Sequence, residues 1–346
     1  MPSDKFGIPQ VSNEDYIRLK GYRLETNDIV FSRVGSVDIN AHVGIEQNGW
    51  LFSGRVLRVR PKYDIDSLFL HYALSTEAVK RDIRNRAVGQ TMPSINTPIL
   101  SSTTIQLPKD LFEQKKVAHF LRLLDERIIT QNKIIEKLQS LIKGLNDNIH
   151  KGIKGETVCF SDLGEAYSGL SGKGGDDFGY GEPFITYMNV YQNTYISEKD
   201  YELVQIAPNE KQNSVQYGDA LFTLSSETPE EVGIGAVYLG NTQKLYLNSF
   251  CFGIHFYDER VLPQYLAHFI SSSSFRRAIY PLAQGSTRFN LQKNDFMKMK
   301  FLLPSLEKQG HIANTLDALH CRLANEKSLT EQYILLKKYL LSLMFI

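Results

Sequence analysis

The sequence predicts an α+β fold in which two β-rich domains are each followed by a long helix, and the two helices pair as a coiled coil. Three observations carry this prediction: short motifs recur in the same order in both halves, apolar residues follow a heptad spacing after each half, and glycine and lysine residues end the first helix. The chain has 346 residues, of which 42% are hydrophobic and 22% charged, so it is long and apolar enough to form more than one core.

Five pairs of segments repeat in preserved order, separated by about 190 residues. The pairs are Asn27–Ser32 with Gly218–Thr223, Phe69–Tyr72 with Tyr265–His268, Gly89–Thr91 with Gly285–Thr287, Leu107–Pro108 with Leu303–Pro304, and Gln114 and Ala118 with Gln309 and Ala313. Solenoid repeats recur every ~20–50 residues, so this separation indicates a duplicated domain. Chance similarity between short β-rich segments is the alternative, and the preserved order argues against it.

A long helix is predicted after each Leu-Pro step. In the first helix, apolar residues alternate at spacings of three and four, and Gln131 fills the one polar place in this seam. The apolar places are Leu121, Leu124, Ile128, Ile135, Leu138, Ile142, Leu145 and Ile149. Lys151 and Gly152 then end the helix.

The second helix runs from about Leu306 to the C-terminus. Its apolar residues are Leu316, Leu319 and Leu323, followed after a one-position slip near Glu326 by Leu329, Tyr333, Leu336, Leu340 and Leu343. A two-stranded coiled coil within one chain would bury both seams. The alternative is that each helix packs separately on its own domain.

Motifs for catalysis are missing from the sequence. The glycine-rich stretch around Lys173 lacks the spacing of a nucleotide-binding P-loop, and no HExxH, GxSxG, GxGxxG or Asn/Asp-Pro-Pro-Tyr/Phe motif occurs. The eight histidines and three cysteines show no metal-ligand spacing. We therefore expect a non-catalytic chain that binds no cofactor or metal of its own. The absence of a secretory signal, of a transmembrane run and of paired cysteines leads us to expect a cytoplasmic protein.

Two basic clusters occupy the same place in the repeat. Arg55–Arg86 holds eight basic against four acidic residues, and Arg276–Lys300 holds six against one. Each cluster is continuous with or contains a polar loop, Gly89–Ser94 or Gly285–Asn290, of residue types that reach base edges and phosphates. Taken alone, each loop and its charges could equally well be a solvated turn. The occurrence of both in the same place of the repeat favours a role in DNA binding.

The predicted DNA-contacting residues come from these clusters and from one further segment. They are Arg55, Arg58, Arg84, Arg86, Gln90, Thr91, Tyr187, Asn189, Arg276, Arg277, Ser286, Thr287, Arg288 and Asn290. Tyr187 and Asn189 are included because they would alternate on one face of a predicted strand within Phe184–Tyr191, a pattern that a half-buried strand also explains.

Both halves together resemble the specificity subunits of type I restriction-modification systems, over nearly the whole chain. The run Leu107–Ala118, continuing to Leu124–Ile128, is similar to the family's entry into its central conserved helix. Leu303–Gln309 is the second copy, which departs at His320, where the first copy has Asp125. The entries Asn27–Val30 and Gly218–Leu221 resemble the family's "GD" strand, and Phe184–Tyr191 resembles its early hydrophobic strand.

The resemblance implies a division of the chain and a set of partners. Residues 1–108 and 155–304 would be target recognition domains that each read part of a bipartite site in double-stranded DNA, and helices 109–154 and 305–346 would form an antiparallel coiled coil. Two DNA methyltransferase (modification) subunits and restriction motor-nuclease subunits would join this chain, and S-adenosylmethionine, ATP and Mg would belong to those partners. No membrane partner is expected.

One departure concerns the start of the first domain. Only 27 residues precede Asp28, whereas roughly 60 separate Gly155 from Asp219, and no counterpart of Phe184–Tyr191 is present. We therefore expect an N-terminally truncated first domain. The alternative function is a coiled-coil assembly protein whose β-rich domains bind protein partners.

Overall fold

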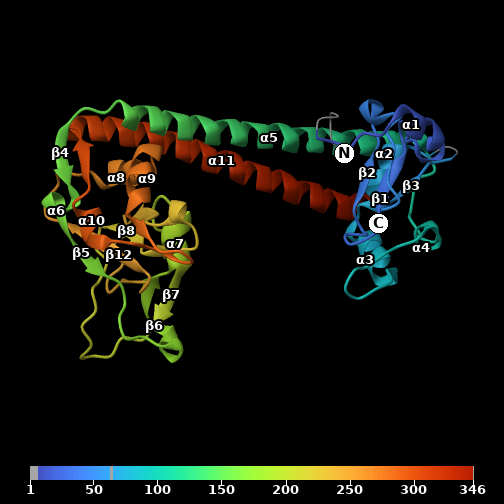
Figure 1. Ribbon diagram of the computed structural model, residues 1–346. Coiled ribbons are helices and arrows are strands. Elements are labelled where there is room, and N and C mark those ends of the chain that lie inside the picture. The colour runs from blue at the N-terminus through green and yellow to red at the C-terminus, as the bar shows by residue number, and fades with distance from the viewer. Residues whose placement is uncertain (1–6, 63–64, 346) are drawn as a thin grey trace. The chain divides into compact units, whose positions relative to one another are not determined.

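The computed structural model describes residues 7–62 and 65–345 and has an α+β fold (Figure 1). The chain divides into two compact units, one formed by Ile135–Asn325 and the other by the residues on either side of that range. Two long helices, α5 (Leu111–Lys151) and α11 (Leu306–Met344), contribute to both units.

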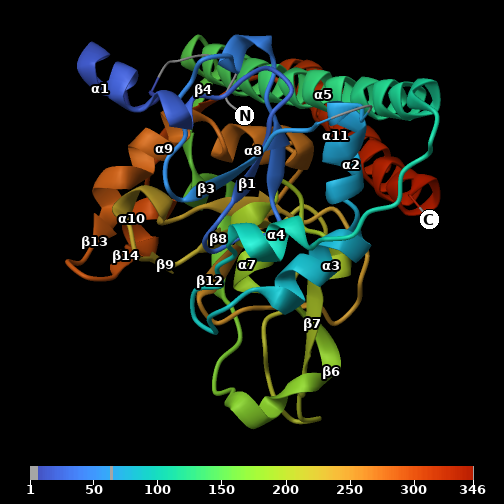
Figure 2. The ribbon, with the colours of Figure 1, turned by 90° about the vertical axis from the view of Figure 1, so that its right-hand side faces the viewer.

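The first unit contains a three-stranded antiparallel sheet in the order β2-β1-β3, covered by short helices (Figure 2). Its elements are α1 (Asn13–Arg18), β1 (Ile29–Ser32), β2 (Asn40–His42), β3 (Val56–Val59), α2 (Ser67–Leu74), α3 (Glu77–Arg86) and α4 (Thr97–Ser101). Alternate residues of β1 point to one side, where Ile29 and Phe31 pack with Leu70 and Ile83 from the helices. This packing forms the core of the unit.

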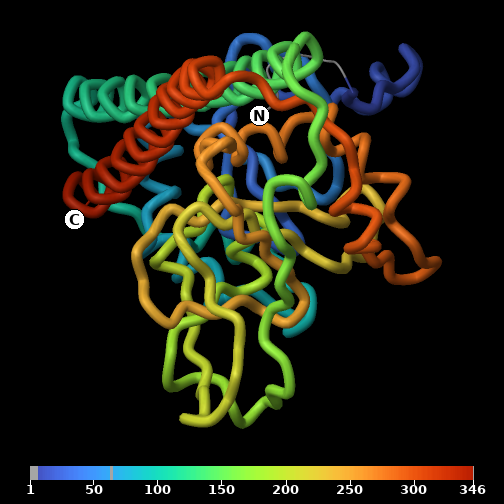
Figure 3. The backbone as a smooth tube through the Cα atoms, turned by 90° about the vertical axis from the view of Figure 1, so that its left-hand side faces the viewer, coloured from blue at the N-terminus to red at the C-terminus, as the bar shows by residue number. Residues whose placement is uncertain are grey.

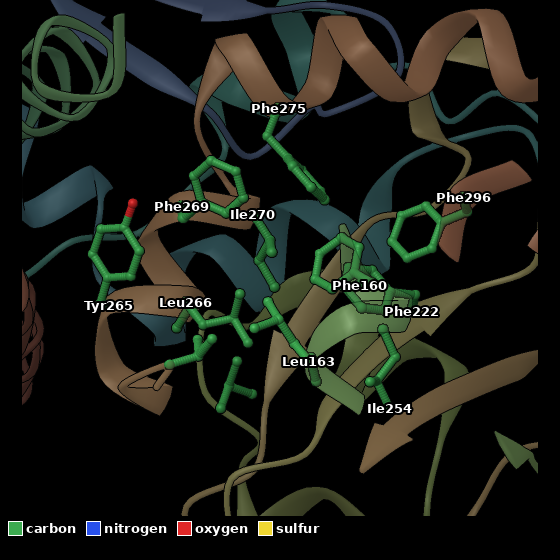
Figure 4. Close-up of a cluster of buried hydrophobic side chains, with 14 of the residues drawn as sticks. Phe160, Leu163, Phe222, Ile254, Tyr265, Leu266, Phe269, Ile270, Phe275 and Phe296 are labelled. Atoms are coloured by element: carbon green, nitrogen blue, oxygen red, sulfur yellow. The ribbon is translucent and has the colours of Figure 1, made fainter. Parts of the chain in front are cut away.

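The second unit is built around a four-stranded sheet in the order β10-β8-β12-β5. Its strands are β4 (Glu156–Cys159), β5 (Gly164–Ser168), β6 (Phe178–Ile185), β7 (Tyr201–Val204), β8 (Ala220–Thr223), β9 (Ser225–Ser226), β10 (Gly235–Val237), β11 (Tyr246–Leu247), β12 (Cys251–Phe256), β13 (Ala283–Gln284), β14 (Phe289–Leu291) and β15 (Lys300–Leu303). Its short helices are α6 (Phe160–Leu163), α7 (Tyr187–Gln192), α8 (Pro263–Ile270), α9 (Ser273–Ile279) and α10 (Lys293–Met297). Phenylalanine rings from the sheet and the helices, including Phe160, Phe222 and Phe296, form its core (Figure 4).

The strand registers match between the two units, as expected for a duplicated domain. In the first unit β1 lies between β2 and β3, and Phe31 pairs with Leu57. In the second unit β8 lies in the same way between β10 and β12, and Phe222 pairs with Phe252. The two units therefore share one arrangement of three strands.

A buried aspartate explains the repeated strand entry. Asp28 and Asp219 are 1% and 2% exposed, and each accepts a hydrogen bond of 2.8 Å from the amide three residues earlier in the chain. The residue before each aspartate has a positive φ, 74° at Asn27 and 89° at Gly218, which favours Asn or Gly. Burial opposes ionisation of Asp28, but hydrogen bonds from Arg60 and Glu25 and the positive charge of Arg60 lower its pKa overall.

A buried glutamine explains the repeated Leu-Pro…Gln motif, and we call it the glutamine clamp. Gln114 Nε2 donates to the Pro108 carbonyl at 2.8 Å, and its Oε1 accepts from the Asp66 amide at 3.0 Å. Gln309 makes the same bonds to Pro304 at 2.9 Å and to the Leu262 amide at 2.7 Å. Because Asp66 and Leu262 are the residues before α2 and α8, each clamp ties a long helix to a short helix of its domain.

Within each unit the segments of α5 and α11 that belong to it pack against each other, and the two helices run in opposite directions (Figure 3). This confirms the predicted antiparallel coiled coil. In the first unit Leu121, near the start of α5, packs in a cluster with Leu340, near the end of α11. In the second unit Ile149, near the end of α5, packs against the cluster that contains Leu316, near the start of α11.

The predicted slip in the second seam is wrong. Glu326 and Thr330 are both 6% exposed and continue the regular spacing from Leu323, while Leu336 and Leu343 are 43% and 48% exposed. Polar residues hold these places because each has a partner. The Gln131 amide on α5 donates to Glu326, the Thr330 hydroxyl donates to the Glu326 carbonyl at 2.9 Å, and Lys337, further along the same spacing, pairs with Asp125 on α5. The seam of α11 was therefore misplaced after Leu323, because the prediction considered only apolar residues.

Candidate nucleic-acid interface

The two polar loops have the same backbone design. Gly89 and Gly285 have φ values of 101° and 141°, and a Cβ at these positions would lie 2.9 Å and 2.1 Å from the carbonyl oxygen three residues later. Each loop joins a pair of bridged residues, Val88 with Ser94 and Gln284 with Asn290. A glycine is therefore required in each tight loop, and the Gly89 and Gly285 loops of the two units have equivalent backbone structures.

The loop side chains predicted to contact DNA project into solvent. Gln90 and Thr91 in the first unit, and Ser286 and Thr287 in the second, are exposed. Within the described parts of the chain their side chains form no hydrogen bond, so their donors and acceptors are available to a ligand.

Arg288 and Asn290 extend this surface in the second unit. Asn290 is exposed on β14, where it pairs with Ser225 of β9. The Arg288 guanidinium is exposed and lies 5.8 Å from the ring centroid of Phe250.

Sequence reasoning missed Phe250, which is 55% exposed beside the loop. Its backbone is held on both sides, because its amide donates to Asn248 Oδ1 at 2.9 Å and its carbonyl accepts from Leu224 at 2.8 Å. The Asn-Ser-Phe turn before β12 was the only signal in the sequence, and it gives no indication that the ring faces solvent.

Arg276 has a structural role, which corrects its prediction as a phosphate contact. Its guanidinium donates to the carbonyls of Gly233, Glu230 and Val232 at 2.6, 2.8 and 2.7 Å. Burial lowers the pKa of this guanidinium. The neighbouring Arg277 is exposed on the same helix and remains a candidate for a phosphate contact.

Three of the four predicted arginines in the first unit also bond within the protein. Arg58 donates to the Arg23 carbonyl at 2.7 Å, and Arg84 forms ion pairs with Asp38 and Glu77. Arg86 donates to the Ile99 carbonyl at 2.9 Å and to two hydroxyl groups. Arg55, in contrast, is exposed and makes no side-chain hydrogen bond to the described residues. One acidic residue counted in this cluster, Asp64, lies outside the described residues.

The predicted strand through Tyr187 and Asn189 is wrong, because β6 ends at Ile185 and helix α7 begins at Tyr187. The Thr186 hydroxyl caps this helix by accepting from the Asn189 amide at 3.2 Å. Asn189 is 2% exposed and bonds both the amide and the carbonyl of Ser197, so it is a structural residue. The Tyr187 hydroxyl donates to Ser225 at 2.9 Å, and burial raises its pKa.

The described residues contain no group of three or more His, Cys, Asp or Glu side chains that could hold a metal ion. In the same residues, no helix is both long and apolar enough to span a membrane.

A duplicated chain that exposes a matching polar loop in each half has the features of a nucleic-acid-binding protein with two reading domains. Residues 6–140 and 154–332 match the family model of the type I restriction modification DNA specificity domain, and the chain belongs to that family.

Two relatives and two solved structures are similar to this chain. The MjaX specificity subunit of Methanocaldococcus jannaschii is 26% identical over 97% of this chain and 81% of its own length. The MjaVIII specificity subunit of the same organism is 30% identical over 38% of this chain and 32% of its own length. A chain from a study of assembly and conformational transition of a type I restriction-modification system has a TM-score of 0.60 at 16% identity, covering 92% of this chain and 82% of that one. The S subunit of such a system from M. genitalium has a TM-score of 0.54 at 14% identity, covering 94% and 84%.

Proposed function

We propose that this protein is the specificity subunit of a type I restriction-modification enzyme and directs its methyltransferase and restriction subunits to a bipartite DNA target. The observation that carries the proposal is the pair of matching loops at Gly89 and Gly285, one in each region that matches the specificity-domain family. This family membership also argues against a coiled-coil assembly protein that binds only other proteins.

The exposed side chains suit recognition of bases and phosphates. Arg288 can donate two parallel hydrogen bonds to guanine in the major groove, and the amides of Gln90 and Asn290 can each bond both edge groups of adenine. The exposed cations Arg55 and Arg277 can contact phosphates and position the loops without reading sequence. In this proposal the loop residues, Arg288 included, read the base sequence, and Arg55 and Arg277 supply affinity.

The helix pair in the first unit offers a surface for the modification subunits. Large apolar side chains remain exposed on both helices, and such a surface is typical of a protein interface. They are Phe112, Phe120, Leu123, Ile129 and Ile134 on α5, and Ile334, Leu335, Leu336, Tyr339 and Leu343 on α11. We infer that two methyltransferase subunits assemble around the helices, in keeping with the duplicated fold.

Catalysis would belong to the partners in this assembly. S-adenosylmethionine would be bound by the modification subunits, ATP and Mg by the restriction subunits, and this chain would supply no catalytic residue. A cytoplasmic location, where chromosomal and incoming DNA are both accessible, follows from the same proposal.

The test is methylation mapping with this chain and its cognate modification subunit. We expect Gln90→Ala with Thr91→Ala to relax recognition in one half of the target, and Ser286→Ala with Thr287→Ala to relax the other half. Lys211→Ala, an exposed change outside both loops, is the control and should leave the map unchanged. Unaltered maps for both loop variants would contradict the proposal.

A further inference from the structure

The sheet of the first unit has an open edge where the second unit has a strand. In the second unit β12 lies between β8 and β5, so both of its edges are paired. Its counterpart β3 has the same register, since Val59 pairs with Ile29 as Ile254 pairs with Ala220. Among the described residues no strand pairs with the other edge of β3.

A second pairing is missing at the same place. In the second unit β15 pairs with β4, and Leu303 is 7% exposed. Leu107, its counterpart in the first unit, is 36% exposed in a segment that forms no strand in the described chain. Both missing partners correspond to one continuous segment of the second unit, Glu156–Ser168, which contains β4, α6 and β5.

The open edge lies in a groove of about 870 Å³ within the first unit. Successive residues of β3 line the groove together with apolar side chains that include Leu70, Leu100 and Ile105. Leu57 is only half-buried there, whereas its counterpart Phe252, covered by β5, is fully buried. The groove therefore leaves apolar surface and strand backbone uncovered.

Charge identifies the chemistry of what the groove accepts. Arg33, Arg58, Arg60 and Lys62 line it, and none of the described lining residues is acidic. Arg60 is ion-paired with Asp28 and Glu25, so the positive charge offered to a partner comes from Arg33, Arg58 and Lys62, which form no ion pair with a described residue. The segment that fills the equivalent place in the second unit, Glu156–Ser168, contains three carboxylates and no basic residue. In the strand register Glu165 lies opposite His255, whose counterpart in the first unit is Arg60. The His255 ring bonds the buried Asp219, and Arg60 likewise bonds the buried Asp28.

We propose that this groove binds an extended acidic and apolar segment of another polypeptide, which adds a strand to β3. Strand addition to an exposed sheet edge draws its affinity from backbone hydrogen bonds and its specificity from alternate side chains. The Glu156–Ser168 segment is the template for this partner because it occupies the matching edge of β12.

One position shows how the partner differs from the template. Tyr167 packs over Gly253, where an added Cβ would lie 2.2 Å from the tyrosine ring. The counterpart of Gly253 is Arg58, so a tyrosine opposite it would meet a side chain. The bond from Arg58 to the Arg23 carbonyl uses one guanidinium nitrogen, so an acidic residue at that position of the partner would instead pair with the remaining N–H groups of Arg58.

The binding test uses the full chain and a fluorescein-labelled peptide of residues 155–169 with Tyr167→Glu, measured by fluorescence anisotropy. We expect saturable binding of one peptide per chain, tighter than the peptide with the natural Tyr167. In the second unit, the Gly169 amide donates to Cys251, so alternate amides, including that of residue 167, face β12. N-methylation at residue 167 should therefore weaken binding about tenfold, whereas N-methylation at residue 166 should not.

Two further measurements locate the site. Arg58→Glu should weaken the Tyr167→Glu peptide about tenfold and strengthen a Tyr167→Arg peptide, while Arg81→Glu, an exposed change outside the groove, should do neither. Absent or non-saturable binding, or equal binding of both N-methyl peptides, would overturn the proposal. Displacement of the peptide by duplex DNA, with DNA binding lost in Arg58→Glu, would show that the groove is a DNA site instead.

Discussion

Replacing Gln309 with leucine tests whether the glutamine clamp holds the C-terminal helix to its domain. Gln309 is 0% exposed, and its amide donates to the carbonyls of Pro304 and Arg260, both at 2.9 Å, while accepting from the Leu262 amide at 2.7 Å. Leucine keeps most of the volume and leaves these three backbone groups without a partner. At about 1 kcal/mol for each lost bond, the free energy of local opening should fall by about 3 kcal/mol.

Hydrogen exchange is the suitable assay, because a chain of two units does not unfold in a single step. The amides at the start of α8 should exchange roughly a hundredfold faster in Gln309→Leu, since each 1.4 kcal/mol is about a factor of ten. Gln114→Leu removes two bonds, so the start of α2 should lose about 2 kcal/mol. Gln332→Leu, an exposed change on α11, is the control. Unchanged exchange at α8 in Gln309→Leu would refute the clamp.

Three further predictions follow from buried or paired polar groups. Burial lowers the pKa of His71 from its ordinary 6.5 to about 4, so the folded first unit favours the neutral ring. The stability of this unit should therefore fall as pH drops from 6.5 toward 4. In urea titrations, His71→Gln should flatten that pH dependence. Arg277→Ala should reduce the salt dependence of DNA binding by about one phosphate contact, whereas Arg276→Ala should mainly lower thermal stability; the reverse pattern would contradict the structural assignment of Arg276. Replacing Gln131 alone with leucine should destabilise the helix pair, because it removes a hydrogen bond that the buried Glu326 carboxylate accepts. Replacing both residues with leucine should restore or raise stability in thermal melts.

The sequence could not show which of the predicted DNA-contacting side chains are exposed and which are bonded within the protein. Arg276 and Arg277 are adjacent and chemically identical, yet one bonds three carbonyls and the other faces solvent. Tyr187 and Asn189 have strand-like spacing, but the Thr186 cap begins a helix there. The exposure of Phe250 could not be predicted, because a phenylalanine in the sequence does not reveal whether its ring is buried or faces solvent.

The sequence by itself determined the duplication, the two long helices and the positions of the polar loops, because each depends on local requirements that recur in both halves. The positive φ before each buried aspartate is adopted by Asn27 and Gly218, and the tight turn of each polar loop requires Gly89 and Gly285. Heptad spacing of apolar residues indicates a helix seam. Only the tertiary structure decided which arginines are available and that Glu326 continues the seam, because these outcomes depend on partners far along the chain. The open edge of β3 likewise became visible only when its pairing was compared with that of β12, since strand pairing is a long-range property. The expected truncation of the first domain stays a prediction.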